Sequence, residues 1–238
     1  MAHSQARQET PSRIVTLNVR HGGGRRVRPL AGYLSGTNAD VLVITEFRTG
    51  TSGSELTAAM REAGYSHQHW TVEENGKNAV MIACRMPFEP VAFSLPQGHS
   101  HRLVGARFGS LELWAAYMAL GKEKLPLYAL LGSTTPHSTI LIGDFNTGLH
   151  RLDEQGATFT AAKEFANLQE NGWIDVWRRQ HGPDAREYSW FSPAGNGFRL
   201  DHAFVSDDLI DRVSECRYDH VTRSKLTDHS ALTLELTD

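Results

Sequence analysis

Residues 138–147 read Ser-Thr-Ile-Leu-Ile-Gly-Asp-Phe-Asn-Thr, in which an apolar run is followed by the polar residues Asp144 and Asn146. The run predicts a buried strand with these two residues at its carboxyl end. Side chains two positions apart in an extended chain point the same way, so the carboxylate and the amide share one face. Such a pair can orient a water molecule and donate to a phosphate oxygen. The alternative is a simple turn, because Asp and Asn favour turns after a strand.

Five other strand-like segments each carry a polar residue at or near one end. The segments are 13–17, 40–45, 111–116, 199–205 and 229–235. Their polar residues are, in chain order, Asn18, Glu46, Tyr117, Asp201, Asp228 and His229. A purely structural explanation has to account for each of these residues separately, whereas a single hydrolytic site explains all of them together.

Strand-like runs dominate the rest of the sequence. Further strands are predicted near 66–72, 78–84, 88–94, 102–108, 188–192 and 213–221. Helical patterns are fewer and cover 28–34, 54–62, 123–131 and 159–170. No linker or internal repeat divides the chain. Helices mingled with many strands predict an α/β fold in which two packed sheets are covered by helices.

The overall composition is that of an ordinary soluble globular protein. With 238 residues, 40% of them apolar and 21% charged, the chain can form a substantial core. Its formal net charge of −3 predicts no strong nonspecific attraction to nucleic acid or anionic membranes, so any polyanion site must be local. One candidate is the segment 22–28, which contains Arg25, Arg26 and Arg28, although a solvated loop is an equal alternative.

The N-terminus and the cysteines carry few functional signals. Residues 1–12 are polar and lack the apolar region of a signal peptide, which predicts a disordered arm before a single domain over 13–238. No run approaches transmembrane length, and we expect a cytoplasmic monomer without a membrane span. Cys84 and Cys216 have no spacing typical of a zinc site or a disulfide framework.

Five short motifs carry a resemblance to a known family. They are Leu-Asn-Val-Arg at 17–20, Ile-Thr-Glu at 44–46, Gly-Asp-Phe-Asn at 143–146, Arg-Leu-Asp-His at 199–202 and Thr-Asp-His-Ser at 227–230. In this order, over residues 13–236, the sequence resembles the endonuclease/exonuclease/phosphatase superfamily. Segment 172–206, with Phe198 just before Arg-Leu-Asp, is most similar to the exonuclease III-like abasic-site endonucleases. The resemblance implies a four-layer sandwich of two packed mixed β-sheets flanked by helices.

A divalent metal is expected both from the resemblance and from the residue types. Hard oxygen ligands suit Mg²⁺ or Mn²⁺, and Mg²⁺ is usually held by one or two carboxylates together with waters. Glu46 is therefore the first predicted metal ligand, with Asn18 and Asp228 as helpers. The alternatives are a solvated strand-end acid for Glu46 and a turn residue for Asn18.

The resemblance also implies catalytic roles for five residues. His229 would contact the scissile phosphate, and Asp201 would fix its tautomer and raise its basicity. Asp144 would position or deprotonate the attacking water. Asn146 and Tyr117 would donate to phosphate oxygens, an electrostatic contribution that is often the largest in catalysis.

Aromatic and basic residues are the candidates for substrate contacts. The predicted substrate-binding residues are Arg20, Arg25, Arg26, Trp190 and Phe198. Trp190 and Phe198 would wall a pocket for a base-free sugar, although a core aromatic is an equal alternative for Trp190. Arg20 stands where many abasic-site enzymes have an acidic or amide residue.

The sequence departs from the family pattern again at 118–121, where Met-Ala-Leu-Gly replaces the usual loop after Tyr117. These departures bear on the substrate more than on the chemistry. We expect a divalent-metal-dependent phosphodiester hydrolase, a nuclease that acts on DNA at abasic sites or at 3′ ends. A phosphatase or phosphodiesterase for a lipid or small phosphoester is the alternative. A catalytically inactive binding module is a third possibility, which the full set of acidic residues disfavours.

Overall fold

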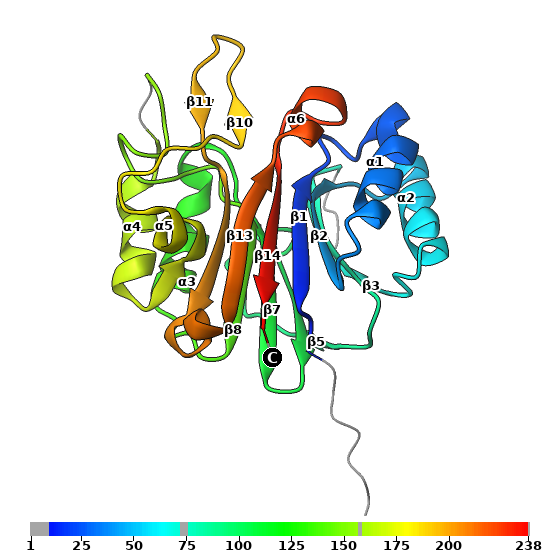
Figure 1. Ribbon diagram of the computed structural model, residues 1–238, viewed down its shortest axis with the longest axis horizontal. Coiled ribbons are helices and arrows are strands. Elements are labelled where there is room, and N and C mark those ends of the chain that lie inside the picture. Colours follow the sequence, from blue (N-terminus) through cyan, green and yellow to red (C-terminus); the bar gives the residue numbers. More distant parts are fainter. Residues whose placement is uncertain (1–9, 72–75, 157–158, 238) are drawn as a thin grey trace, which may run out of the picture.

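The computed structural model describes residues 10–71, 76–156 and 159–237 and shows two six-stranded mixed sheets with helices on their outer sides (Figure 1). The first sheet has the order β13-β14-β1-β2-β4-β3 and the second the order β5-β6-β7-β8-β12-β9. Strands β10 and β11 form a separate hairpin. The expected four-layer α/β sandwich is confirmed.

The strands are short and regular. The first sheet contains β1 (Arg13–Asn18), β2 (Val41–Phe47), β3 (His67–Trp70), β4 (Ala79–Cys84), β13 (Val213–Asp219) and β14 (Ala231–Leu236). The second sheet contains β5 (Glu89–Val91), β6 (Leu103–Phe108), β7 (Leu111–Tyr117), β8 (Thr139–Asp144), β9 (Trp173–Asp175) and β12 (Asp201–Ser206). The hairpin is formed by β10 (Trp190–Phe191) and β11 (Gly197–Phe198).

The helices lie mainly outside the sheets. Those packed beside the first sheet are α1 (Val27–Gly36) and α2 (Thr51–Glu62), and those beside the second are α3 (Leu125–Gly132) and α4 (Ala162–Glu170). Shorter elements are α5 (Val176–His181), α6 (Val221–Lys225) and the 3-10 helices η1 (Gly24–Arg26), η2 (Gly121–Lys124) and η3 (Asp207–Arg212). No helix in the described ranges is both long and apolar enough to cross a membrane.

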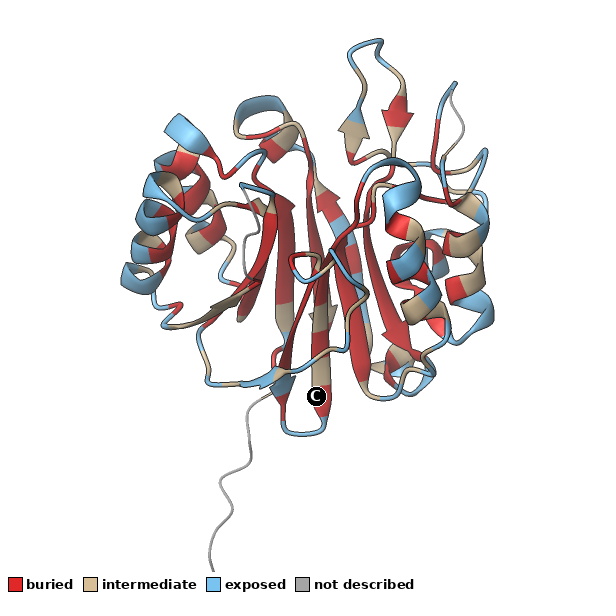
Figure 2. Cartoon of the chain, turned by 180° about the vertical axis from the view of Figure 1, so that it is seen from behind, coloured by how far each residue is buried: buried red, intermediate tan, exposed pale blue. Residues whose placement is uncertain are grey.

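Alternate residues of the central strands enter different cores. In β2, Val41 and Val43 face the core between the sheets, whereas Leu42 and Ile44 pack in the core that includes α1 and α2. Both faces of the strand are therefore buried, as Figure 2 shows for the central strands. This double burial explains why the sequence shows continuous apolar runs here instead of alternation.

Each sheet contains one central parallel pair, β1 with β2 and β7 with β8. Parallel neighbours end at the same edge of a sheet, and ligands of α/β sheets bind outside the carboxyl ends of the strands. Asn18, Tyr117 and Asp144 are the last residues of β1, β7 and β8, and Glu46 is the last but one of β2. The hairpin and α6 lie at this same end of the molecule (Figure 1).

Several predicted elements differ at their ends for local reasons. The predicted strand 213–221 ends at Asp219, whose carboxylate accepts from the N–H of Val221 at 2.9 Å and turns the chain into α6. The predicted helix 159–170 begins at Ala162, because Ala161 has a left-handed φ of 70°. Of the predicted arm 1–12, residues 1–9 lie outside the described residues, and Ser12 donates to Asp40 Oδ2.

Candidate active site

Asn18 joins two carboxylates that come from different sheets. Its Nδ2 donates to Asp144 Oδ2 at 2.8 Å and to Glu46 Oε1 at 3.2 Å. Its Oδ1 accepts from the backbone N–H of Arg20 at 2.8 Å, which fixes the orientation of the amide. Glu46 belongs to the first sheet and Asp144 to the second, so this buried amide ties the two sheets together at their shared edge.

The backbone at Glu46 is left-handed, with φ of 53°. A positive φ is uncommon outside glycine, and such conformations cluster at functional sites. At Glu46 it coincides with a bulge in the pairing of β2 with β4, between Thr45 and Phe47. The bulge re-aims the carboxylate, which accepts from the backbone N–H of His21 at 2.7 Å.

Gly143 allows β8 to approach β7 closely. A Cβ atom at this position would lie 2.0 Å from the carbonyl oxygen of Ala116, and the φ of Gly143 is 145°. A side chain is therefore excluded just before Asp144. The close approach keeps Asp144 in register with Tyr117 on the neighbouring strand.

Asp201 and His229 form a buried hydrogen-bonded pair beside Asp144. His229 Nδ1 lies 2.8 Å from Asp201 Oδ2, and Asp201 pairs with Asp144 across β12 and β8. The nearest ligand atoms of Asp144, Asp201 and His229 all lie within 4.8 Å of one another. Asp201 thus orients the imidazole, as the family resemblance implies, and leaves Nε2 as its second polar atom.

The charges of this cluster shift the pKa of its members. Burial alone would lower the pKa of His229, but the carboxylate of Asp201, with Asp144 and Asp228 behind it, raises this pKa to about 10. Burial raises the pKa of Asp144 to about 7, an effect that the positive charge of His229 opposes and Asp201 increases. The carboxylates therefore favour the charged form of the imidazole, and burial favours the neutral form of Asp144.

Tyr117 reaches the site from β7. Its hydroxyl lies 3.3 Å from Glu46 Oε1 and accepts from Asn78 Nδ2 at 3.2 Å, while the guanidinium of Arg102 lies 5.1 Å from the ring centroid. Burial, with Glu46, raises the pKa of Tyr117, so the hydroxyl keeps its proton. The sequence interpretation missed Asn78 and Arg102, because each precedes an apolar strand where polar residues are commonplace.

Asn146 is also left-handed, with φ of 48°. Its backbone N–H donates to Asp144 Oδ1 at 2.9 Å, and its Nδ2 donates to the carbonyl oxygen of Met118 at 2.9 Å. The second hydrogen of Nδ2 is left for a substrate oxygen. Asp144 and Asn146 are thus physically linked, since the backbone N–H of Asn146 helps to hold the carboxylate.

The predicted metal ligands make different contacts. Asn18 and Glu46 are in contact, whereas Asp228 Oδ2 lies 3.3 Å from Trp190 Nε1 and 3.6 Å from Arg20 Nε. The carboxylates of Glu46 and Asp144, which Asn18 Nδ2 bridges, offer oxygen atoms of the kind that a hard divalent cation prefers. Ligand atoms converge in the neighbouring group of Asp144, Asp201 and His229, and the carboxylates of the site fit Mg²⁺ or Mn²⁺ in their chemistry.

Trp190 and Phe198, the two aromatic residues predicted to line a pocket, belong to the hairpin that contacts His229. Trp190 and Phe198 are cross-strand partners in the hairpin, with ring centroids 5.6 Å apart, and Phe159 lies 5.7 Å from Phe198. Trp190 also bridges to His229 through the backbone. Trp190 and Phe198 are both half-buried.

The arginines of the N-terminal loop differ in their surroundings. Arg20 and Arg25 are exposed, and Arg20 lies against Asp228 at the mouth of the site. Arg26 instead donates to the backbone carbonyls of Val19 at 3.2 Å, Arg20 at 2.9 Å and Leu226 at 2.6 Å. These bonds use the guanidinium to hold the loop, which favours a structural role for Arg26.

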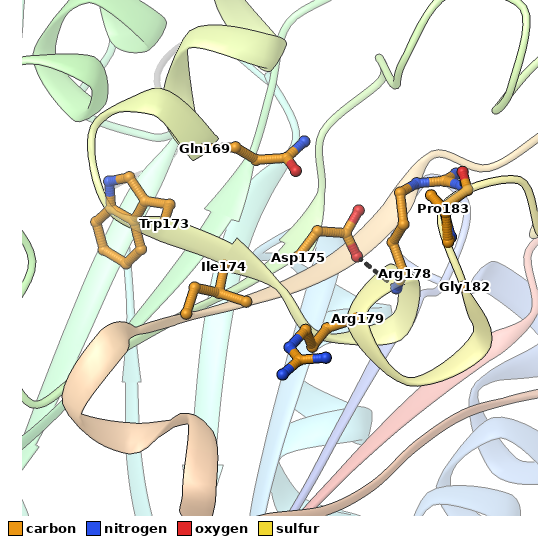
Figure 3. Close-up of a pocket in the computed structure, with 8 residues that line it drawn as sticks. All are labelled: Gln169, Trp173, Ile174, Asp175, Arg178, Arg179, Gly182 and Pro183. Atoms are coloured by element: carbon orange, nitrogen blue, oxygen red, sulfur yellow. Dashed lines mark hydrogen bonds between the residues drawn. The ribbon is translucent and has the colours of Figure 1, made fainter.

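A pocket of about 400 Å³ beside β9 and α5 contains none of these residues (Figure 3). Two of its charged groups, Asp175 and Arg178, are already paired. Asp175 accepts from Arg199 at 2.5 Å, and Arg178 bonds to Asp153, which Arg199 also contacts at 2.7 Å. This buried network joins three segments of the chain. Because one of its members, Arg199, lies two residues before Asp201, the network anchors the start of β12.

Solved structures share this fold at low sequence identity. An AP endonuclease from Archaeoglobus fulgidus has a TM-score of 0.82 and 23% identity, over 94% of this chain and 99% of that one. The 3′ phosphatase NExo from Neisseria, bound to product DNA hairpin, has a TM-score of 0.79 and 23% identity, over 95% and 100%. The 3′-5′ exonuclease NExo from Neisseria meningitidis gives 0.78 and 24%, over 95% and 100%.

The sequence itself matches a family over most of its length. Residues 15–229 match the Endonuclease/Exonuclease/phosphatase family, and the match runs from β1 to His229. It includes every strand end that contributes to the cluster of Asn18, Glu46, Tyr117 and Asp144. The chain therefore belongs to the Endonuclease/Exonuclease/phosphatase family and is a hydrolase of phosphoester bonds.

Proposed function

We propose that residues 13–238 form a single catalytic domain that hydrolyses DNA phosphodiesters with a divalent metal, at abasic sites or at 3′ ends. One observation carries the proposal. The carboxylates held by Asn18 meet the His229–Asp201 pair at the shared edge of the two sheets. Phosphodiester hydrolysis needs an activated water and stabilised phosphate charge, and this cluster has groups for both.

Asp144 is the group that we assign to the attacking water. Asn18 holds its Oδ2 and the N–H of Asn146 holds its Oδ1, so the carboxylate cannot turn away. A pKa of about 7 suits a general base at neutral pH. Asp144 would orient the water and accept its proton.

His229, Tyr117 and Asn146 are the groups that we assign to the phosphate. The imidazolium of His229 would donate from Nε2, because Asp201 already engages Nδ1. Asn146 has a spare amide hydrogen, and Tyr117 keeps its phenolic proton. Fixed donors that meet developing negative charge in a buried site contribute strongly to catalysis.

Glu46, with Asn18 beside it, would hold the metal. When bound, Mg²⁺ or Mn²⁺ would neutralise phosphate oxygens and stabilise the leaving oxygen. Asp228 contacts both Arg20 and Trp190, so we assign it the role of orienting these two substrate-binding side chains. Its carboxylate would keep the indole of Trp190 turned toward His229.

DNA is the proposed substrate because two kinds of observation agree. The solved relatives include an AP endonuclease and a 3′ phosphatase bound to product DNA hairpin. In this chain, Trp190 and Phe198 are partly exposed aromatic rings at the site, and Arg20 and Arg25 are exposed charges. Stacking faces and exposed arginines are typical of nucleic-acid sites.

A small or lipid phosphoester is the second candidate. The net charge of −3 and the short connection at 118–121 support it, because neither favours a long polyanion. Such a substrate would use the same catalytic groups without the arginines.

Removal and return of the metal test the proposed chemistry. We expect a chelator to abolish cleavage of an abasic-site duplex, and added Mg²⁺ to restore it while the fold stays intact by circular dichroism. Undiminished cleavage after exhaustive chelation would contradict the assigned role of Glu46 and Asn18.

A further inference from the structure

Lys124 is a buried cation behind the loop that carries Asp144 and Asn146. It is the last residue of η2, after the short connection that follows Tyr117, and its side chain is buried. Its Nζ donates to the main-chain oxygen of Asn146 and, at 2.6 Å, to Thr147 Oγ1. Both acceptors are neutral oxygens of the catalytic loop.

Burial of a lysine beside neutral partners costs free energy, so its presence here needs an explanation other than packing. Charged groups lose their hydration on burial, and lysine is among the residues least often fully buried. Burial lowers the pKa of Lys124 to about 8, although the charge of Asp144 opposes the change. An apolar side chain would fill the same space without this cost, so packing alone does not explain the choice of lysine.

The oxygen that Lys124 holds belongs to a residue in an uncommon conformation. Asn146 has φ of 48°, and its N–H and side-chain amide are already engaged by Asp144 and Met118. The bond from Lys124 fixes the third polar group, the main-chain oxygen. Thr147 extends the support, because its hydroxyl donates to the carbonyl of Thr160 at 2.7 Å.

We propose that Lys124 is a positioning residue for the hydrolytic reaction, holding Asn146 in its left-handed conformation and thereby orienting the Asp144 carboxylate. The proposal rests on the proposed function in one respect only, that Asp144 and Asn146 act on the phosphoester. Lys124 itself is too deeply buried to touch a substrate. Its loss should therefore lower kcat and leave KM nearly unchanged.

The test compares Lys124→Met with Lys124→Arg on a phosphoester that the wild type cleaves. A displaced catalytic group of this kind costs on the order of 10- to 100-fold in rate, so we expect that fall in kcat for K124M, with KM within about twofold. Arginine also donates to two oxygens and should recover most of the loss. Lys122→Met is the matched control, because Lys122 is exposed on the same 3-10 turn.

A second measurement reads the conformation directly. Backbone and Cβ chemical shifts of Asn146 report its positive φ, and they should move in K124M and stay in place in K122M. If K124M does not fold, Thr147→Val replaces it, since it removes one of the two acceptors of Nζ and should lower kcat by about three- to tenfold.

Wild-type kcat in folded K124M, a rise in KM that accounts for the whole loss, or unchanged Asn146 shifts would overturn the proposal. So would wild-type kcat in T147V, if that variant has to stand in. Failure of the wild type to cleave any phosphoester would sink the proposed function instead, and the chemical shifts alone would then decide the role of Lys124.

Discussion

Glu46 and Asn146 both have a left-handed backbone conformation at the site. A left-handed backbone at a residue other than glycine costs about 1–3 kcal/mol, so each needs surrounding structure to hold it. Glu46 is held by the bulge in β2 and by the N–H of His21. Asn146 is held at its N–H, its side chain and its carbonyl oxygen.

Glu46→Gln should remove most of the activity and leave the fold intact. The substitution keeps the shape of the side chain and opens no cavity. It removes the negative charge of the carboxylate that we propose binds the metal. We expect the Mg²⁺ concentration for half-maximal activity to rise by about 10-fold or more. Glu62→Gln, at an exposed position, is the control. Full turnover of E46Q at ordinary Mg²⁺ would rule out the assignment.

Asp144→Asn and His229→Ala should each lower kcat by about 10²-fold or more, the usual scale of general-base and electrostatic contributions. The two groups belong to one charge-coupled cluster, so their effects should be far from additive. Single-turnover rates of both single variants and the double variant measure this. A double variant that lost the full product of the single losses would give the two residues independent roles.

At the scale of elements, we expect the β10–β11 hairpin to select the substrate. Phe198→Ala removes a wall of the pocket while leaving the charges in place, so it should reduce kcat/KM for an abasic-site duplex by about 10-fold, as expected for one lost stacking contact. Cleavage of a small phosphodiester should change little. Phe191→Ala removes an exposed ring from the same hairpin and serves as the control. Equal losses on both substrates would assign Phe198 to the core.

Elements also show where sequence reasoning stops. The strand ends that carry Asn18, Glu46, Tyr117 and Asp144 could be predicted because each follows a largely apolar run of strand length. Lys124 was not, because its partner lies 22 positions away and only the folded loop brings them together. Likewise α5 and β9 are too short for any periodicity to show.

The roles of the charged loops were equally hidden. Arg25 and Arg26 are adjacent and identical in type, yet one is exposed and the other bonds to three backbone carbonyls. Composition cannot separate them, since only the folded chain brings the carbonyls of Val19, Arg20 and Leu226 to Arg26. The contact of Asp228 with Trp190 was hidden as well, because the two residues lie 38 positions apart in the sequence.

At the scale of the molecule, a net-acidic protein needs local charge to hold DNA. The double variant R25A/R28A should weaken duplex binding regardless of sequence and flatten the plot of log K against log salt by up to about 2 units of slope. Arg107→Ala should leave the slope unchanged, because Arg107 pairs with Glu112 at the opposite end of β7 from Tyr117. Identical slopes for wild type and double variant would remove the arginine loop from the DNA site.

The whole molecule is best tested by its choice of substrate. The measurement is kcat/KM of the wild type with Mg²⁺ on an abasic-site duplex, an intact duplex, a 3′-phosphorylated duplex and a panel of small phosphoesters. We expect the abasic-site or the 3′-phosphorylated duplex to be preferred over intact duplex and over every small phosphoester by about 10²-fold or more, the scale expected when one well-matched pocket and several phosphate contacts are used. Equal or faster cleavage of a small phosphoester would contradict the assignment to DNA.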